Sequence, residues 1–244
     1  MRGAAIFLAA ALGLTGQVAV ATPPHVITGA TYAEPTTRYD HGVLGDAVEW
    51  GALALTVDMC SGCETKMVRD FVIRLPETRV FEDVGPRIVD LEGEGSPDVM
   101  VVESDHRLGA RLAIYNEAGL VAATGFIGRR NRWLAPIGAA DLDGDGHVEI
   151  AYVDRPHLAK TIRVWRYKDR KLTEVASLPG FTNHRIGERD IAGGMRRCDG
   201  APEMVVATAD WARLVAVRFQ DGAFQTRDIG PHEGRASFAE AMKC

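Results

Sequence analysis

Short apolar runs separated by polar turns make up the chain from about residue 39 onward. Several of these runs alternate apolar with polar side chains, which is the period-2 pattern of half-buried strands. No stretch shows the sustained 3.6-residue spacing of an amphipathic helix. We therefore predict an all-β body, in which the clearest alternating strands cover residues 71–75, 112–115, 162–167 and 214–219.

A second set of apolar runs follows segments rich in Asp and Gly, and the clearest is 150–153 after Asp-Leu-Asp-Gly-Asp-Gly-His-Val-Glu at 141–149. Acidic side chains fall at loop positions 1, 3, 5 and 9, with Gly at position 6, as in hard-cation sites built on one loop. An EF-hand would need Glu at position 12, where Tyr152 stands. The alternative is a metal-free Asp/Gly turn. We predict a calcium site with carboxylate ligands Asp141, Asp143, Asp145 and Glu149.

The segment at Asp141 belongs to an internal repeat. Counterparts begin at Asp46, Asp90 and Asp190, at intervals of 44, 51 and 49 residues, the length of a four-stranded propeller blade. The unit at Asp90 matches position by position and gives a weaker metal candidate, or an acidic turn without metal. The unit at Asp190 keeps only the first and last acids, and we expect no metal at Asp46. The weaker candidate comprises Asp90, Glu92, Glu94, Ser96 and Asp98.

The recurring motif, an acidic Gly-containing loop followed by an apolar strand, resembles the FG-GAP and VCBS repeats of integrin-type β-propellers over residues 39–230. The resemblance implies a small β-propeller of about four, or five, four-stranded blades. It also implies calcium ligation by the acids at 141–149, with His147 contributing its backbone carbonyl. Two features depart from the family: Asp154-Arg155-Pro156 stands where Gly-Ala-Pro is usual, and integrin-type propellers have more units. An open β-solenoid is the structural alternative.

The two ends of the chain lack the alternation of short apolar runs and polar turns that marks the body. Residues 1–21 combine a basic start, a short apolar core and small residues up to Ala21, which predicts a secretory signal peptide and a secreted or periplasmic protein. The apolar core is too short to span a bilayer, and no other run is long enough. We divide the rest into an extended leader at 22–37, the repeat body at 38–230 and a C-terminal tail at 231–244.

Four cysteines are expected to form disulfides after export. Of the three possible pairings, we favour Cys60 with Cys63, and Cys198 with Cys244. The C-x-x-C spacing at Cys60 is also found in redox motifs, but no helix signal follows it. A zinc site is a further alternative and would need two more ligands, such as His106 and His157.

Basic residues precede the innermost strand of each predicted blade. In a propeller these segments approach the central channel near one face, so their side chains form a candidate ring for an anionic ligand. The alternative is a set of solvated charges. The candidate ligand-binding residues are Arg38, His41, Arg87, Arg132, His184 and Arg185.

Composition narrows the functional classes. The 244 residues are 46% hydrophobic with a formal net charge of −5, which suits one globular domain and lacks the basic footprint of a nucleic-acid binder. Nucleophile-elbow, zincin, Walker and dinucleotide-binding motifs are missing, and we assign no catalytic residue. We therefore predict a monomeric, exported calcium-binding module for a protein, a glycan or another anion. The alternative is an exported hydrolase or lyase with its active site around His41, Arg132 and His184.

Overall fold

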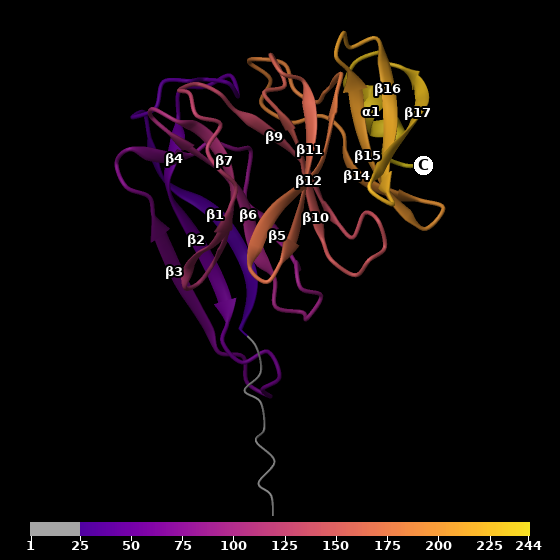
Figure 1. Ribbon diagram of the computed structural model, residues 1–244. Helices are drawn as coiled ribbons and strands as arrows, with labels where there is room; N and C mark the ends of the chain where they lie inside the picture. Colours follow the sequence, from indigo (N-terminus) through magenta and orange to yellow (C-terminus); the bar gives the residue numbers. More distant parts are fainter. Residues whose placement is uncertain (1–24) are drawn as a thin grey trace, which may run out of the picture.

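The computed structural model describes residues 25–244 and shows an all-β molecule with one short helix (Figure 1). Its strands form three sheets of eight, four and five strands. The sheets fan out side by side in chain order, from indigo through orange to yellow, and the helix α1 (Arg235–Ala241) lies on the last one. The predicted signal peptide, residues 1–21, lies outside the described residues.

The first sheet is strongly curled. Its path runs β1-β2-β4-β6-β7-β8, with β3 paired to β2 and β5 paired to β6. The two halves meet where Trp50 of β2 pairs with Phe81 of β4. Leu53 and Leu55 of β2 pack inside the curl against Val99 and Val101 of β6. The strands are β1 (Val26–Thr36), β2 (Glu49–Asp58), β3 (Val68–Arg74), β4 (Arg79–Phe81), β5 (Arg87–Val89), β6 (Asp98–Asp105), β7 (Gly109–Asn116) and β8 (Gly119–Ala123).

The other two sheets are antiparallel meanders. The second sheet has the order β12-β11-β10-β9, and the third has the order β13-β15-β16-β17 with β14 also paired to β15. The strands of the second sheet are β9 (Leu134–Ala140), β10 (Glu149–Asp154), β11 (Thr161–Lys168) and β12 (Lys171–Pro179). Those of the third are β13 (Phe181–Thr182), β14 (Gly194–Cys198), β15 (Ala201–Thr208), β16 (Arg213–Gln220) and β17 (Ala223–Pro231).

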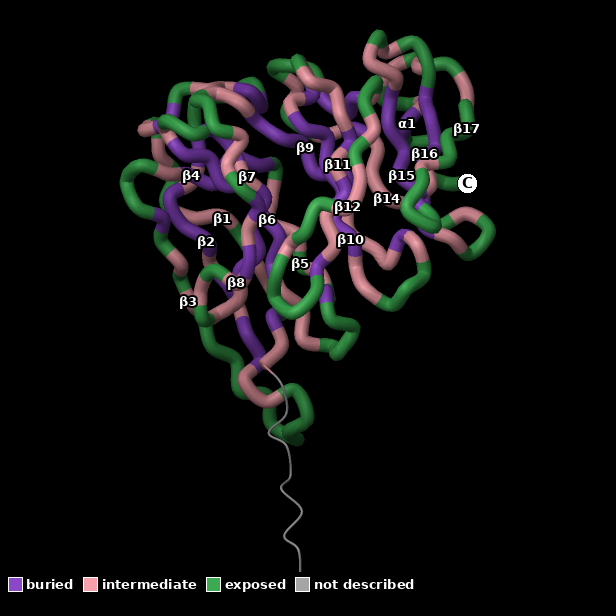
Figure 2. Tube along the Cα trace, viewed as in Figure 1, coloured by how far each residue is buried: buried purple, intermediate pink, exposed green. Residues whose placement is uncertain are grey.

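Hydrophobic cores join each sheet to the next because their central strands are buried on both faces (Figure 2). Successive side chains of a strand point to opposite faces. Ile150 and Tyr152 of β10 therefore pack towards the first sheet, and Ala151 and Val153 pack towards the third. The side chains of β15 alternate in the same way, with Val206 packed towards the second sheet and Val205 packed on the opposite face with Phe238 of α1. This double burial explains the continuous apolar runs that follow the acidic loops in the sequence.

The structure confirms the predicted strands and both favoured disulfides. Three of the alternating runs lie within β7, β11 and β16, and the fourth, 71–75, lies in β3 except for its last residue. The runs after the acidic loops lie in β6, β10 and β15. Cys60 is bonded to Cys63, and Cys198 is bonded to Cys244. The disulfides agree with the predicted export into an oxidising compartment. Within residues 25–244, no helix is long and apolar enough to cross a membrane.

Two features of the first predicted unit differ from expectation. Residues 26–36 form β1, paired with β2 along its whole length, so most of the predicted leader at 22–37 is a strand of the sheet. Asp46 is also not a spatial counterpart of Asp90. The start of β1 lies at the Asp90 loop, where Ser96 Oγ donates to the His25 carbonyl at 2.7 Å, whereas Asp46 follows the far end of β1.

The segment 37–48, which contains Asp46, closes the end of the molecule opposite the acidic loops. Val43 and Leu44 enter the core between the first two sheets. Gly45 has φ +83°, and a Cβ there would lie 2.4 Å from the carbonyl oxygen of Gly187, so this contact requires glycine. The segment is therefore a packed cap.

The other three units share one strand pattern, with one variation. The strand before the acidic loop is continuous in the second sheet, as β9. In the first sheet the corresponding pairing is divided between β4 and β5, and in the third between β13 and β14. The residues inserted between the divided strands, 82–86 and 183–193, contribute side chains to the end of the molecule that the cap covers.

Candidate metal centre and end-face pocket

Residues 141–149, here called the acid loop, connect β9 to β10. Asp141 organises the turn, because its Oδ1 accepts the N–H of Gly144 at 2.8 Å and its Oδ2 accepts the N–H of Gly146 at 3.1 Å. Both glycines have positive φ, 80° and 87°, which favours glycine. The sequence thus fixes a tight loop that turns the following carboxylates towards β10.

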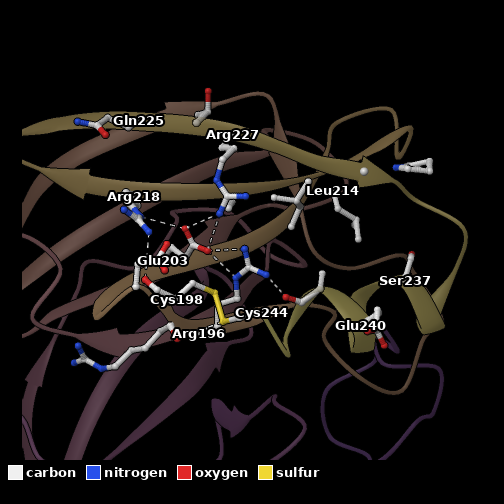
Figure 3. A pocket seen from close by; sticks show the side chains of 18 of the residues that line it. Arg196, Cys198, Glu203, Leu214, Arg218, Gln225, Arg227, Ser237, Glu240 and Cys244 are labelled. Atoms are coloured by element: carbon white, nitrogen blue, oxygen red, sulfur yellow. Dashed lines mark hydrogen bonds and ion pairs between the residues drawn. A yellow bond between two sulfur atoms is a disulfide. The ribbon is translucent and has the colours of Figure 1, made fainter.

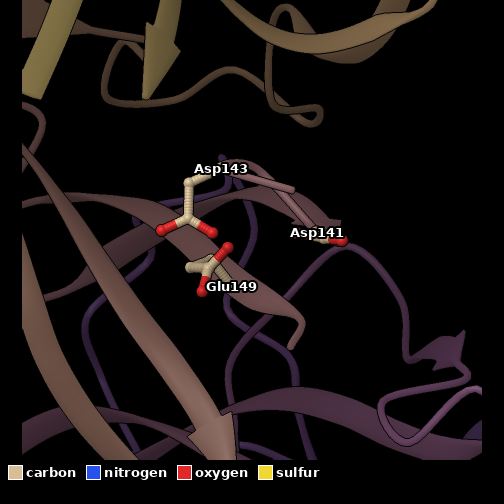
Figure 4. A group of neighbouring side chains, drawn as sticks. All are labelled: Asp141, Asp143 and Glu149. Atoms are coloured by element: carbon tan, nitrogen blue, oxygen red, sulfur yellow. The ribbon is translucent and has the colours of Figure 1, made fainter. Parts of the chain in front are cut away.

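Three side chains of the acid loop approach each other closely. The carboxylates of Asp141, Asp143 and Glu149 have oxygen atoms that all lie within 4.8 Å of one another (Figure 4). They form the single such group of His, Cys, Asp or Glu side chains among residues 25–244. Glu149 is fully buried at the start of β10, and an all-oxygen set of this kind fits a hard divalent cation.

Arg166 is a cation that already contacts this group. It pairs in register with Glu149 across β10 and β11, and its Nε donates to Glu149 Oε1 at 2.6 Å. Its Nη1 lies 3.1 Å from Asp145 Oδ2, and its Nη2 donates to Asp143. Burial raises the pKa of Glu149, and the hydrogen bond from Arg166 opposes that rise. Because one guanidinium faces four loop carboxylates, the acid loop keeps an excess of negative charge. A bound metal would share the carboxylate oxygens with Arg166 or displace the arginine from them.

The loop at 90–98 has the same backbone turn but a different arrangement of acids. Asp90 Oδ1 accepts the N–H of Gly93 at 2.9 Å and Oδ2 accepts that of Gly95 at 3.0 Å, as Asp141 does in the acid loop. Ser96 is bonded to the His25 carbonyl instead of pointing to a shared centre. Burial raises the pKa of Asp98 to about 6. The side chains of Glu92 and Glu94 do not join a compact group of the kind found at Asp141.

The predicted basic ring is brought together only in part. His41 and Arg132 line one small pocket, here called the end-face pocket, at the end of the molecule opposite the acid loop. The other lining residues are Asn131, Trp133, Arg155, His157 and Leu158. Since β10 has six residues and a strand rises about 3.3 Å per residue, the acid loop and this pocket lie about 20 Å apart.

Three predicted ring residues have other partners. Arg38 donates from Nε to the Arg79 carbonyl at 3.0 Å. Arg87 forms an ion pair with the buried carboxylate of Asp83. The exposed Arg185 lies over the ring of Trp211, at 4.2 Å from its centroid. These arginines stabilise local structure and do not reach the end-face pocket.

Arg132 differs from most arginines of the molecule. It is half-buried, and its Nη1 donates to the Asn131 carbonyl at 3.1 Å. It forms no ion pair within the described part of the chain. Arg155, by contrast, makes a bidentate pair with Asp154, at 2.8 and 2.9 Å. The uncompensated positive charge of the end-face pocket is therefore that of Arg132.

Two histidines form a hydrogen-bonded chain beside this pocket. His184 is buried and donates from Nε2 to the Glu188 carbonyl at 2.9 Å, so its neutral Nδ1 accepts from Nε2 of His157 at 3.0 Å. Burial lowers the pKa of His157 to about 4, with further lowering from His184 and His41. Burial also lowers the pKa of His184. Both rings are neutral at pH 7.

His41 is held by a buried carboxylate. Its Nδ1 lies 2.6 Å from Oε1 of Glu82, a residue with no exposed surface. Ser104 Oγ donates to the second oxygen of Glu82, and the Trp133 indole donates to its backbone carbonyl at 2.8 Å. Glu82 thus fixes the orientation of His41, whose Nε2 has no hydrogen-bond partner within the described residues.

Sequence reasoning missed four contributors to these sites. Arg166 has no motif, and its role depends on pairing with Glu149 across two strands. Glu82 and Arg155 lie in turns without a recognisable pattern, and His157 was considered only as a zinc ligand. The four cysteines are joined in two disulfides, which does not match thiolate zinc ligands, whereas a Cys60–Cys63 disulfide is also the oxidised form of a redox C-x-x-C pair.

No protein-family model, curated protein or solved structure matches the chain.

Proposed function

We propose that this chain is an exported, calcium-binding β-propeller module that binds a carboxylate-bearing ligand, such as an acidic glycan, in the end-face pocket. The observation that carries the proposal is Arg132, a half-buried guanidinium without a carboxylate partner in the described chain, beside an oriented His41. A ligand carboxylate supplies the missing countercharge, and arginine binds carboxylates through paired N–H donors. Neutral His157 adds a polar ring at the same pocket.

Three features support the propeller part of the proposal. The sheets stack through hydrophobic cores in chain order, three of the units share one strand pattern, and two loops share one hydrogen-bonded turn. In this proposal the three sheets hold the blades of an incomplete or open ring, with the first sheet holding two units. Calcium, when bound, neutralises the acid loop carboxylates. Asp141, Asp143, Asp145 and Glu149 would hold it, with His147 as a candidate carbonyl donor.

A titration with glucuronate tests the ligand proposal. We expect the wild-type protein to bind glucuronate and Arg132→Ala to weaken binding about tenfold, the value of one charge-assisted hydrogen bond. Arg130→Ala is the matched control, because Arg130 lies two residues away and is paired with Asp40 at an exposed position. Equal affinity of wild type and Arg132→Ala would contradict the proposal, as would the absence of any binding by the wild type.

An exported hydrolase or lyase is the second candidate, and the His41–Glu82 pair favours it. A histidine oriented by a buried carboxylate is a common general base. Incubation with a uronic-acid polysaccharide, followed by measurement of released ends, distinguishes the candidates. An enzyme shows turnover that is lost in His41→Ala with the circular dichroism spectrum retained, whereas a binding module shows no turnover in either protein.

A further inference from the structure

The last sheet has one face that no other sheet covers. Val215 and Val217 of β16 point towards the second sheet, so the alternate residues Leu214, Ala216 and Arg218 point away from it. The helix α1 covers part of this outer face, where Phe238 packs against Leu214. The remainder is an open groove between the sheet and the C-terminal segment, which the Cys198–Cys244 disulfide holds beside it (Figure 3).

Three arginines converge on one carboxylate at the floor of this groove. Glu203 of β15 is almost fully buried and bonds Arg196 Nη2 at 2.5 Å, Arg218 Nε at 3.2 Å and Arg227 Nη2 at 3.2 Å. Figure 3 shows the three guanidinium groups reaching Glu203 from three different strands. Three positive groups and one negative group leave a formal excess of two positive charges. We call this place the arginine groove.

The arginine groove is the counterpart of the acid loop with the charges reversed. Glu203 in the third sheet corresponds to Glu149 in the second. On the preceding strand, Glu203 pairs with Arg196, whereas Glu149 pairs with Ala140. On the following strand, Arg218 donates to Glu203, as Arg166 donates to Glu149. In the second sheet several carboxylates surround one arginine, which suits a cation. In the third sheet, three arginines surround one carboxylate. The same position of the repeat therefore carries a positive excess.

Two of the three arginines have donors directed to the groove. The side chain of Arg218 is 33% exposed and that of Arg227 is 58% exposed, while Arg196 is 7% exposed. Arg227 reaches Glu203 through Nη2 alone, which leaves its Nε and Nη1 for another acceptor. Burial would raise the pKa of Glu203, but the hydrogen bonds from Arg196 and Arg218 and the charge of Arg227 outweigh it, and the pKa lies below its ordinary value.

Acidic residues at the rim do not cancel this excess. Glu240 forms an ion pair with Lys243 at 2.9 Å. Asp199 and Glu233 are exposed, so water and salt screen their charges. The charges of Arg196 and Arg218 instead lie against a buried glutamate, where electrostatic interactions are stronger.

We propose that the arginine groove binds a small polyanion, a ligand that carries two or more negative charges on closely spaced carboxylate, sulfate or phosphate oxygen atoms. Two negative charges match the formal excess of the floor. The Nε and Nη1 of Arg227 and the Nη1 of Arg218 have no partner within the described residues and offer charged N–H donors to oxyanions. This site is separate from the end-face pocket, which is lined by different residues at the opposite end of the repeat.

Calorimetric titration with citrate and with inorganic phosphate tests this proposal, each probe representing one source of the oxyanions. We expect at least one probe to bind the wild-type protein and Arg227→Ala to weaken that binding about tenfold. Arg213→Ala is the matched control, because Arg213 lies on the same strand as Arg218 but pairs with Asp228 outside the groove. Arg227→Ala should leave glucuronate binding unchanged, because Arg227 lines only the arginine groove, which separates this site from the end-face pocket.

A second variant keeps the proposal testable if Arg227→Ala perturbs the fold. Glu203→Gln removes the internal carboxylate that competes for the arginines, so it should tighten binding of the same probe several-fold while it lowers thermal stability. A purely structural ion pair would give only the loss of stability. Failure of both probes to bind would overturn the proposal. Equal weakening by Arg213→Ala, or loss of binding in Arg132→Ala alone, would overturn it too.

Discussion

Arg166 contacts three carboxylates of the acid loop and acts as a countercharge within the chain. A guanidinium spreads one charge over a plane, whereas a divalent ion concentrates two charges in a small sphere. The arginine therefore stabilises the metal-free loop, and it would compete with a metal for the same oxygen atoms. Replacement of Arg166 should therefore change both the stability of the metal-free loop and its affinity for a metal.

Replacing this arginine should raise calcium affinity. Arg166→Gln is expected to increase calcium affinity about tenfold, since a competing charge-assisted contact is removed. The same change should lower stability without calcium, and isothermal titration together with thermal melts in chelator measures both effects. Arg163→Gln is the control, because Arg163 lies on the same strand but pairs with Asp154 and Glu174. Unchanged or weaker calcium binding by Arg166→Gln would contradict competition.

His157 should make the protein sensitive to mild acid. The pKa of His157 is about 4 in the folded chain and near 6.5 when unfolded, so only the unfolded chain takes up the proton between these values. Its contribution to stability is full above pH 6.5 and falls as the pH drops towards 4, by up to about 3 kcal/mol. Urea unfolding at several pH values measures this slope.

The variant His157→Gln should have a shallower slope between pH 6.5 and 4. Glutamine retains an N–H that can donate to His184 but does not titrate. His25→Gln serves as the control because the His25 side chain is 40% exposed. If the wild type and His157→Gln lose stability in parallel over this range, the acid sensitivity comes from other groups.

Among the elements, the strands followed from sequence more reliably than the sheets. Alternation and apolar runs predicted β7, β10, β11 and β16, because local burial imposes those patterns. The number of sheets did not follow, because β4 joins two units through the Trp50–Phe81 pairing and no local pattern records that contact. Strand β1 was missed for a similar reason, since Pro35 and its polar neighbours mask its pairing with β2.

The residues of the candidate sites also divide into those that the sequence predicted and those that it did not. Asp141, Asp143 and Glu149 were predictable because one short loop carries them and its glycines fix the turn. Arg132 and His41 were named from sequence, but their grouping with Arg155 and His157 depends on contacts between distant turns. The arginine groove had no sequence signal, since its three arginines lie on three strands.

The two disulfides should differ in their effect on stability. The Cys198–Cys244 bond closes a loop across 46 residues and holds α1 on the third sheet, whereas Cys60–Cys63 spans three residues. Chain entropy alone assigns about 4 kcal/mol to the first and about 1.5 kcal/mol to the second. Urea unfolding of Cys198→Ala/Cys244→Ala and of Cys60→Ala/Cys63→Ala tests this order. Equal losses would show that loop length does not set these contributions.

At the scale of the whole molecule, three groups of charged side chains lie at different places: one at each end of the stacked sheets and one on the outer face of the third sheet. The acid loop lies at one end of β10, the end-face pocket lies at the other, and the arginine groove lies on the open side of the third sheet. These sites share one scaffold of stacked sheets, whose central strands are buried on both faces. Calcium at the acid loop would act on the stability of this scaffold, about 20 Å from the end-face pocket.

The most direct test is the melting temperature of the wild type and of Asp143→Ala, each with excess calcium and with chelator. Calcium at 100 times its dissociation constant stabilises the folded state by about 2.7 kcal/mol. For a protein of this size that corresponds to a rise of about 5–10 °C. The proposal predicts this rise in the wild type and its near absence in Asp143→Ala. No calcium-dependent rise in the wild type, or an equal rise in both proteins, would contradict it.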